Sequence, residues 1–255
     1  MSDDRREFLK VASAATAVTG TILAAAPAAA QTAKPGGFKG VKALAFDAYG
    51  TLFDVHSVQA RCEAFWPGKG AQLSQTWRAK QLEYTWQRSL MGRYVPFSQV
   101  TGEALLFSCE LLKLKIGERE KQSLMNEYLN LAAYPEVPAA LERLQGRKLA
   151  ILTNGSPDMI EPLVKNRGME KTFAAVLSVD ELKVYKPAPA VYELAVKKLK
   201  TPKEDVGFVS SNCWDALGAK SFGFTVYWIN RTKAPVDRLG FQPDEIVGGM
   251  HEVLL

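Results

Sequence analysis

The stretch AFDAYGTLFD, residues 45–54, ends an apolar run, VKALAF, with Asp47. The chain breaks at the following glycine and offers a second carboxylate only at Asp54. An apolar run that stops at a glycine turn predicts a buried strand, here over residues 41–48. Asp47 then stands as the one acid at the mouth of this strand, with Tyr49 two positions further on.

The second half of the chain repeats the short apolar run four times. These runs cover residues 149–155, 174–179, 206–211 and 224–229, and helical patterns cover residues 157–166, 188–199 and 214–221 between them. Buried strands that alternate with helices are typical of a parallel sheet covered on both faces.

A long segment after the first strand follows a different pattern. It carries almost no strand signal, but it has four stretches with helical spacing, at residues 57–65, 73–91, 98–113 and 118–131. We therefore predict an α/β fold with a Rossmann-like parallel sheet core, residues 31–56 and 132–255. An all-helical cap, residues 57–131, is inserted after the first strand.

Composition limits the classes of protein to consider. The 255 residues are 47% hydrophobic, which is enough for the core of one large domain with an insertion. The net charge of +5 is spread along the chain without a basic, aromatic-rich strip, so no nucleic-acid partner is expected. Three cysteines, with no CxxC pair and two histidines, argue against a zinc site or a disulfide framework. A single Cys62–Cys109 disulfide stays open, because it depends on an oxidising compartment.

The N-terminus has the features of an export signal. Arg5 and Arg6 precede a weakly apolar run, residues 11–26, and small residues lead up to Ala30. A membrane anchor is the alternative, but the run is shorter than the roughly 18 residues that a span requires. We predict a twin-arginine signal over residues 1–30, cleavage near Ala30, and a periplasmic mature protein without a stable membrane anchor.

Polar residues follow the predicted strands at their carboxyl ends. They are Asp47, Tyr49 and Thr51 after the first strand, Thr153, Asn154 and Gly155 after the second, Asp180 and then Lys186 after the third, and Ser210, Ser211, Asn212 and Asp215 after the fourth. In a parallel sheet these ends meet at one edge, where ligands bind near the point at which the strand order reverses. We expect carboxylates, one ammonium group and several hydroxyl and amide donors to converge there.

Four blocks carry a resemblance to a known family. They resemble, in this order, the motifs of the haloacid dehalogenase superfamily: FDAYGTLFD, LTNG, VYKP around Lys186, and SSNCWD. The pieces WRAKQLEYTWQRSLMGRY and VYKPAPAVYELA are similar to its L-2-haloacid dehalogenase (type II) branch. The resemblance covers nearly all of residues 40–250. It implies cofactor-free and metal-free hydrolysis of a small halogenated carboxylic acid, from an (S)-2-haloalkanoic acid to an (R)-2-hydroxyalkanoic acid and halide, commonly by a homodimer.

The residues themselves give a reason why this chemistry needs no metal. By resemblance, most of the superfamily are magnesium-dependent phosphotransferases with further acids where this chain has Tyr49 and Ser211. A phosphate ester needs a general acid for its leaving alkoxide and a cation for its phosphoryl oxygens. Halide leaves as a stable anion without a proton, so a lone carboxylate such as Asp47 suffices to displace it.

The resemblance also implies a role for each candidate catalytic residue. Asp47 attacks C2 of the substrate with inversion and forms an ester, Lys186 keeps Asp47 ionised, and Asp215 activates the water that hydrolyses the ester. Thr51 and Ser210 hold the two carboxylates in place by hydrogen bonds.

The substrate contacts follow in the same way. Thr153 and the backbone N–H groups after Asp47 hold the substrate carboxylate, and Arg78 of the cap receives the halide together with Asn154. The residues implied for the pocket wall are Tyr49, Leu82, Phe97, Asn212 and Trp214, with Tyr192 as a hydroxyl partner of the charged cluster.

Several alternatives stay open at this point. Two departures from the branch, Ala79 and Cys213, leave the preferred chain length of the substrate undecided, and stereochemical preference depends on pocket geometry. The alternative for Arg78 is a surface arginine paired with Glu83 or another acid of the cap. The alternative for Tyr192 is a core residue without a role in the site. For the whole protein, the alternatives are a magnesium-dependent phosphatase of the same superfamily and a non-catalytic exported module that binds small acids.

Overall fold

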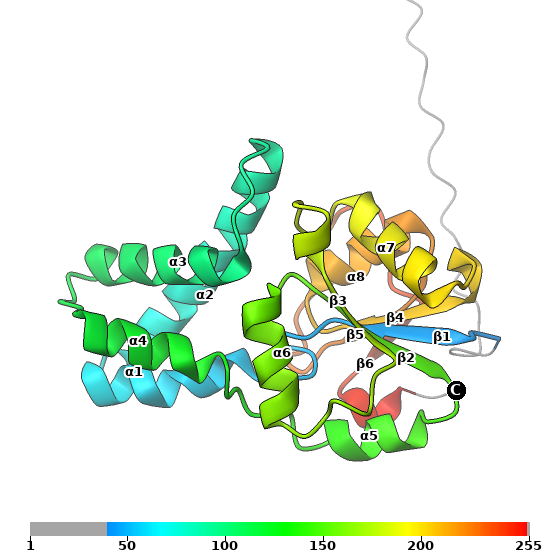
Figure 1. Ribbon diagram of the computed structural model, residues 1–255, viewed down its shortest axis with the longest axis horizontal. Helices are drawn as coiled ribbons and strands as arrows, with labels where there is room; N and C mark the ends of the chain where they lie inside the picture. Colours follow the sequence, from blue (N-terminus) through cyan, green and yellow to red (C-terminus); the bar gives the residue numbers. More distant parts are fainter. Residues whose placement is uncertain (1–39, 254–255) are drawn as a thin grey trace, which may run out of the picture. The chain divides into compact units, whose positions relative to one another are not determined.

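The computed structural model describes residues 40–253 and contains one six-stranded sheet. The strands are β1 (Ala43–Phe46), β2 (Lys148–Thr153), β3 (Ala175–Ser178), β4 (Val206–Ser210), β5 (Thr225–Ile229) and β6 (Glu245–Val247). They run parallel in the order β3-β2-β1-β4-β5-β6 (Figure 1). Every residue of the central strands β1 and β4 is buried, as expected for strands with both faces covered.

Helices cover both faces of this sheet. The helices of the sheet domain are α5 (Val137–Arg143), α6 (Pro157–Asn166), α7 (Pro189–Leu199) and α8 (Cys213–Phe222), and short 3-10 turns lie at Val55–Val58, Val179–Glu181, Lys203–Asp205 and Met250–Glu252. In Figure 1, α7 and α8 lie on one face, and α5 and α6 lie on the other. The arrangement is the predicted α/β fold with a Rossmann-like parallel sheet.

Four helices lie between β1 and α5 in the chain and are drawn beside the sheet in Figure 1. They are α1 (Gln59–Phe65), α2 (Gly70–Leu90), α3 (Phe97–Leu111) and α4 (Glu118–Glu127). The long helix α2 buries Leu73, Trp77, Gln81 and Thr85, which recur every four residues and therefore form one face. This face packs against α3, so the cap has an interior of its own.

The chain reverses its direction of travel across the sheet at β1. From β1 the chain moves outward through β2 to β3, and it then returns to the other side of β1 to build β4, β5 and β6. The carboxyl end of β1 therefore lies at the topological switch point, where open α/β sheets bind their ligands. Asp47 is the first residue after β1.

The predicted strands and helices are confirmed, with differences at their ends. Helix α2 begins at Gly70 rather than at residue 73, because a Glu63 carboxylate oxygen accepts a hydrogen bond (2.8 Å) from the Gly70 N–H and holds it. Helix α4 ends at Glu127 rather than at residue 131. The sequence patterns did not predict helix α5 or strand β6, which have only 7 and 3 residues.

The predicted export signal, residues 1–30, lies outside the described residues. Between residues 40 and 253, no helix has both the length and the apolar character needed to cross a membrane.

Candidate active site

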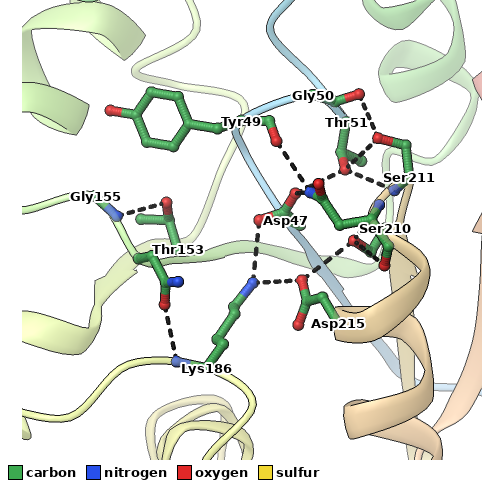
Figure 2. A network of polar contacts seen from close by, with 12 residues as sticks. Asp47, Tyr49, Gly50, Thr51, Thr153, Gly155, Lys186, Ser210, Ser211 and Asp215 are labelled. Atoms are coloured by element: carbon green, nitrogen blue, oxygen red, sulfur yellow. Dashed lines mark hydrogen bonds and ion pairs between the residues drawn. The ribbon is translucent and has the colours of Figure 1, made fainter. Parts of the chain in front are cut away.

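Asp47 is held at the carboxyl end of β1 by contacts on both carboxylate oxygens. Its N–H donates to the Val209 carbonyl (2.9 Å), which extends the pairing with β4 beyond the strand. Its Oδ2 accepts hydrogen bonds from Thr51 Oγ1 (2.8 Å) and Asn212 Nδ2 (2.8 Å). Its Oδ1 lies 3.1 Å from Lys186 Nζ (Figure 2). The carboxylate is thus fixed in direction, and Asp47 is 95% buried.

Lys186 links Asp47 to a second carboxylate. It comes from the loop before α7, where Asn154 Oδ1 accepts a hydrogen bond (2.9 Å) from its N–H, and its side chain is fully buried. Its Nζ lies 3.1 Å from Asp47 and 2.9 Å from Asp215. Burial alone would lower the pKa of Lys186, but the carboxylates of Asp215 and Asp47 outweigh it and raise the pKa above its ordinary value. Lys186 is therefore an ammonium ion.

Asp215 is the buried partner in this cluster. It accepts hydrogen bonds from Lys186 Nζ (2.9 Å), Ser210 Oγ (3.1 Å) and Tyr192 Oη (2.9 Å). Burial raises the pKa of Asp215 to about 6; Lys186 opposes this rise and the charge of Asp47 adds to it. A carboxylate whose pKa lies near neutrality is suited to act as a general base.

The loop after Asp47 is fixed by residues far away in the chain. Gly50 adopts a φ of +91°, which favours glycine, and Thr51 Oγ1 accepts a hydrogen bond (2.8 Å) from the Ser211 N–H. Arg231, after β5, donates to the carbonyls of Gly50 and Thr51 (3.1 Å each) and pairs with Glu136 (2.8 Å). Sequence reasoning missed Arg231, because no motif connects it to this loop.

The cap contributes Arg78 to the same region. Its Nη1 donates to Gln81 Oε1 (2.7 Å), and its Nη2 lies 3.4 Å from the Tyr49 carbonyl and 3.5 Å from Asn212 Oδ1. Arg78 makes no ion pair with any carboxylate of residues 40–253, and Glu83 pairs with Lys80 instead (2.7 Å). The alternative that Arg78 pairs with Glu83 is therefore wrong, and its charge is available to an anion.

A cavity of about 410 Å³ opens beside this arginine. Its walls include Arg78, Leu82, Asn212, Cys213 and Trp214. Of the two departures from the family pattern, Cys213 lies in the wall, whereas Ala79 is exposed on α2 outside it.

The remaining predicted pocket residues surround the cluster at different depths. The ring of Tyr49 packs against Phe97 (5.5 Å between centroids), and Figure 2 shows it pointing away from Asp47. Within the described residues the buried Tyr49 hydroxyl has no hydrogen-bond partner. Trp214 contacts Trp86 of the cap (5.4 Å). Thr153 is buried, and its Oγ1 accepts a hydrogen bond (3.0 Å) from the Gly155 N–H.

One expectation is wrong, and the open question of a Cys62–Cys109 disulfide is answered. Asp180 was expected at this edge, but it accepts a hydrogen bond from Tyr94 of the cap (2.8 Å) and pairs with Lys183 (2.8 Å), so it takes no part in the cluster. Cys62 and Cys109 are buried in the cap as free thiols, not as a disulfide.

The oxygen atoms around Asp47 do not fit the magnesium ion that most members of the superfamily use. The oxygens of Asp47 and Asp215 already accept hydrogen bonds from the ammonium of Lys186 and from hydroxyl and amide groups. A divalent cation needs several free oxygen ligands, and here it would have to displace a buried positive charge. No group of three or more His, Cys, Asp or Glu side chains suited to a metal occurs within residues 40–253.

A nucleophilic carboxylate at the switch point of a parallel sheet, paired with lysine and approached by a helical cap, defines a capped α/β hydrolase. The model of the haloacid dehalogenase-like hydrolases matches residues 41–223. The chain belongs to this family.

Individual relatives are similar over nearly their whole length. The (S)-2-haloacid dehalogenase 2 of Pseudomonas sp. (strain CBS-3) is 49% identical over 215 residues, which cover 84% of this chain and 94% of the relative. The (S)-2-haloacid dehalogenase of Pseudomonas sp. (strain YL) is 50% identical over 216 residues, with 84% and 93% covered. The structure of the L-2-haloacid dehalogenase of Xanthobacter autotrophicus with chloropropionic acid covalently bound has 40% identity and a TM-score of 0.79, with 84% and 96% covered.

Proposed function

We propose that the protein hydrolyses (S)-2-haloalkanoic acids to (R)-2-hydroxyalkanoic acids and halide. The observation that carries this proposal is the buried triad of Asp47, Lys186 and Asp215, in which one ammonium lies 3.1 and 2.9 Å from two carboxylates. The similarity to (S)-2-haloacid dehalogenases over 84% of the chain supports the same reaction.

The first step is displacement of halide by Asp47. Its Oδ1 has one hydrogen-bond partner and its Oδ2 has two, so Oδ1 has the freer lone pairs and attacks C2 of the substrate. The new bond joins Oδ1 to C2, and the halide departs with the electron pair of the carbon–halogen bond. Because the attack comes from the side opposite the halide, the configuration at C2 inverts.

The second step is hydrolysis of the resulting ester. Water adds to the Cγ carbon of Asp47 and loses a proton to Asp215. Negative charge then develops on Oδ2, where Thr51 and Asn212 already donate hydrogen bonds (2.8 Å each). The bond between Cγ and Oδ1 breaks, the proton passes to the departing oxygen, and Asp47 is regenerated with an oxygen atom from water.

The substrate is held by donors that surround Asp47. The N–H groups of Ala48 and Tyr49 donate to no acceptor within residues 40–253, and they suit the substrate carboxylate together with the hydroxyl of Thr153. Arg78 receives the halide, since no carboxylate neutralises it. Asn154 contributes less to halide binding than Arg78, because its Oδ1 already accepts a hydrogen bond from the Lys186 N–H.

The two alternatives explain less of the site. A phosphatase needs a general acid beside Asp47, and Tyr49, which stands in that place, points away from it (Figure 2). A binding module would need neither a fixed carboxylate nor a second one whose pKa is raised to about 6.

The direct test is halide release from each enantiomer of 2-chloropropionate by the purified mature protein in excess EDTA. We expect release from the (S) enantiomer only, unchanged by EDTA, and lost in Asp47→Asn. Release that requires added Mg²⁺, or hydrolysis of a phosphate monoester alone, would replace this function with the phosphatase.

We further propose that the protein is exported through the twin-arginine route, cleaved near Ala30 and active in the periplasm as a homodimer. The paired Arg5 and Arg6 and the small residues before Ala30 support export. Fractionation of cells that carry the wild type or Arg5→Lys/Arg6→Lys tests the route, with loss of the periplasmic form expected in the variant. Sedimentation of the mature protein tests the dimer.

A further inference from the structure

We infer that Gln81 is a positioning residue for Arg78, and that its neutral amide aims the guanidinium at the site while leaving the positive charge uncancelled. The inference rests on the proposed function and adds a residue to its machinery. Gln81 is fully buried in the cap, and Arg78 precedes it by three residues on α2, so both side chains lie on one side of the helix.

The hydrogen bonds around Gln81 determine which way its amide faces. The Thr101 hydroxyl donates its single proton to the Phe97 carbonyl (2.7 Å). With any other close partner, Thr101 Oγ1 must therefore be the acceptor of the hydrogen bond. That partner is Gln81 Nε2, at 2.7 Å. The amide oxygen of Gln81 is thereby turned to Arg78 Nη1, at 2.7 Å.

This chain of bonds leads from the interior of the cap to the guanidinium. The backbone carbonyl of Thr101 also accepts a hydrogen bond from Trp77 Nε1 (2.8 Å), so α2 and α3 are linked twice at the same residue. Arg78 is therefore anchored through Nη1, and its Nη2 faces the Tyr49 carbonyl and Asn212 Oδ1 at 3.4 and 3.5 Å.

The choice of an amide matters for the charge. A carboxylate at this position would form a buried ion pair with Arg78 and weaken its attraction for an anion. An apolar residue would leave the guanidinium free to rotate away from the site. Glutamine supplies a strong acceptor without a negative charge, as the binding of an anionic substrate requires.

The test compares Gln81→Leu with a matched control, Thr85→Val. Thr85 lies one turn further along α2 and is also buried, and its hydroxyl donates to the Leu82 carbonyl (2.6 Å). The control therefore also removes one buried polar group from this face. We expect kcat/KM for (S)-2-chloropropionate to fall about 10- to 100-fold in Gln81→Leu and to stay within about twofold in Thr85→Val. Thermal melts identify the folded variants, and Gln81→Met replaces Gln81→Leu if the latter does not fold.

A double-mutant cycle separates positioning from a general packing effect. In an Arg78→Lys background, loss of Gln81 is expected to cost less than about twofold, because there is no guanidinium left to aim. Gln81→Glu is expected to raise KM and to weaken inhibition by bromide, which a packing role would not do. An unchanged kcat/KM in Gln81→Leu, or an equal loss in both backgrounds, would overturn the inference. An inactive wild type would instead refute the proposed function.

Discussion

At the scale of single residues, the site depends on one ammonium between two carboxylates. Lys186 is fully buried, so its pairing with Asp47 and Asp215 is scarcely screened by solvent. The two acids differ in their surroundings: Asp47 keeps an exposed fraction of 5%, whereas Asp215 is completely buried. This difference supports the proposed roles of Asp47 as nucleophile and Asp215 as base.

The raised pKa of Asp215 predicts the acid limb of the pH profile. A protonated Asp215 accepts no proton from water, so its base form is lost as the pH falls through about 6. We expect kcat to fall about tenfold per pH unit below that point when ester hydrolysis limits turnover. Tyr192→Phe removes a hydrogen bond that lowers the pKa of Asp215, so its midpoint is expected at higher pH. Stopped assays over pH 4–9 measure both profiles, and a midpoint that moves down in the variant would contradict the assignment.

At the scale of elements, the loop after β1 is supported by the end of β5. Arg231 donates to the carbonyls of Gly50 and Thr51, pairs with Glu136, and lies over the ring of Tyr134 at 3.6 Å. A planar guanidinium has the fork of donors that two adjacent carbonyls require, which a lysine lacks. The direction of the Thr51 hydroxyl toward Asp47 therefore depends on a strand two places away in the sheet.

Arg231→Lys tests this support. We expect kcat to fall about tenfold, because the loop loses one or both of its hydrogen bonds and Asp47 moves slightly. In Arg231→Ala, added guanidinium at non-denaturing concentration is expected to restore part of the activity. The control is Arg143→Lys, an exposed arginine that donates to the His251 carbonyl and is expected to change kcat by less than about twofold. Full activity in Arg231→Lys would show that the loop holds its shape without the fork.

The elements also show where sequence reasoning stops. Strands β1 to β5 could be predicted because each is a short apolar run closed by polar residues, and the same pattern placed Asp47, Lys186 and Asp215 at one edge. Helix α5 has seven residues, so its buried Val137 and Leu141 give barely one period, and it is stabilised by packing against the C-terminal turn Met250–Glu252. Strand β6 has three residues, which is too short for any pattern.

The contacts of Gln81 and Arg231 show the same limit within the site. Each depends on a contact with another element, Gln81 with Thr101 of α3 and Arg231 with the loop after β1, and their own sequence neighbours give no signal for these contacts. Asp180 shows the converse, since it follows a strand as the pattern requires, yet it turns to Tyr94 of the cap.

At the scale of the whole molecule, the site is shared between the sheet and the cap. The sheet domain carries Asp47, Asp215 and Lys186, whereas the cap carries Arg78. The two parts meet through the rings of Trp86 and Trp214 and through the hydrogen bond from Tyr185 Oη to the Val95 carbonyl (2.6 Å). In the proposed mechanism this division separates the two charges that the reaction needs: the attacking carboxylate belongs to one part, and the cation that receives the halide belongs to the other.

In the proposed mechanism, Asp47 forms an ester with the substrate, and water then attacks the carbonyl carbon of that ester. The measurement is a single turnover in H₂¹⁸O with protein in excess over (S)-2-chloropropionate, followed by mass spectrometry of the product and of the peptide that contains Asp47. We expect ¹⁸O to enter the Asp47 carboxylate, while the 2-hydroxyl of the product carries an unlabelled oxygen from the protein. Label in the 2-hydroxyl group and none in Asp47 would mean that water attacks C2 directly and that no ester forms on Asp47.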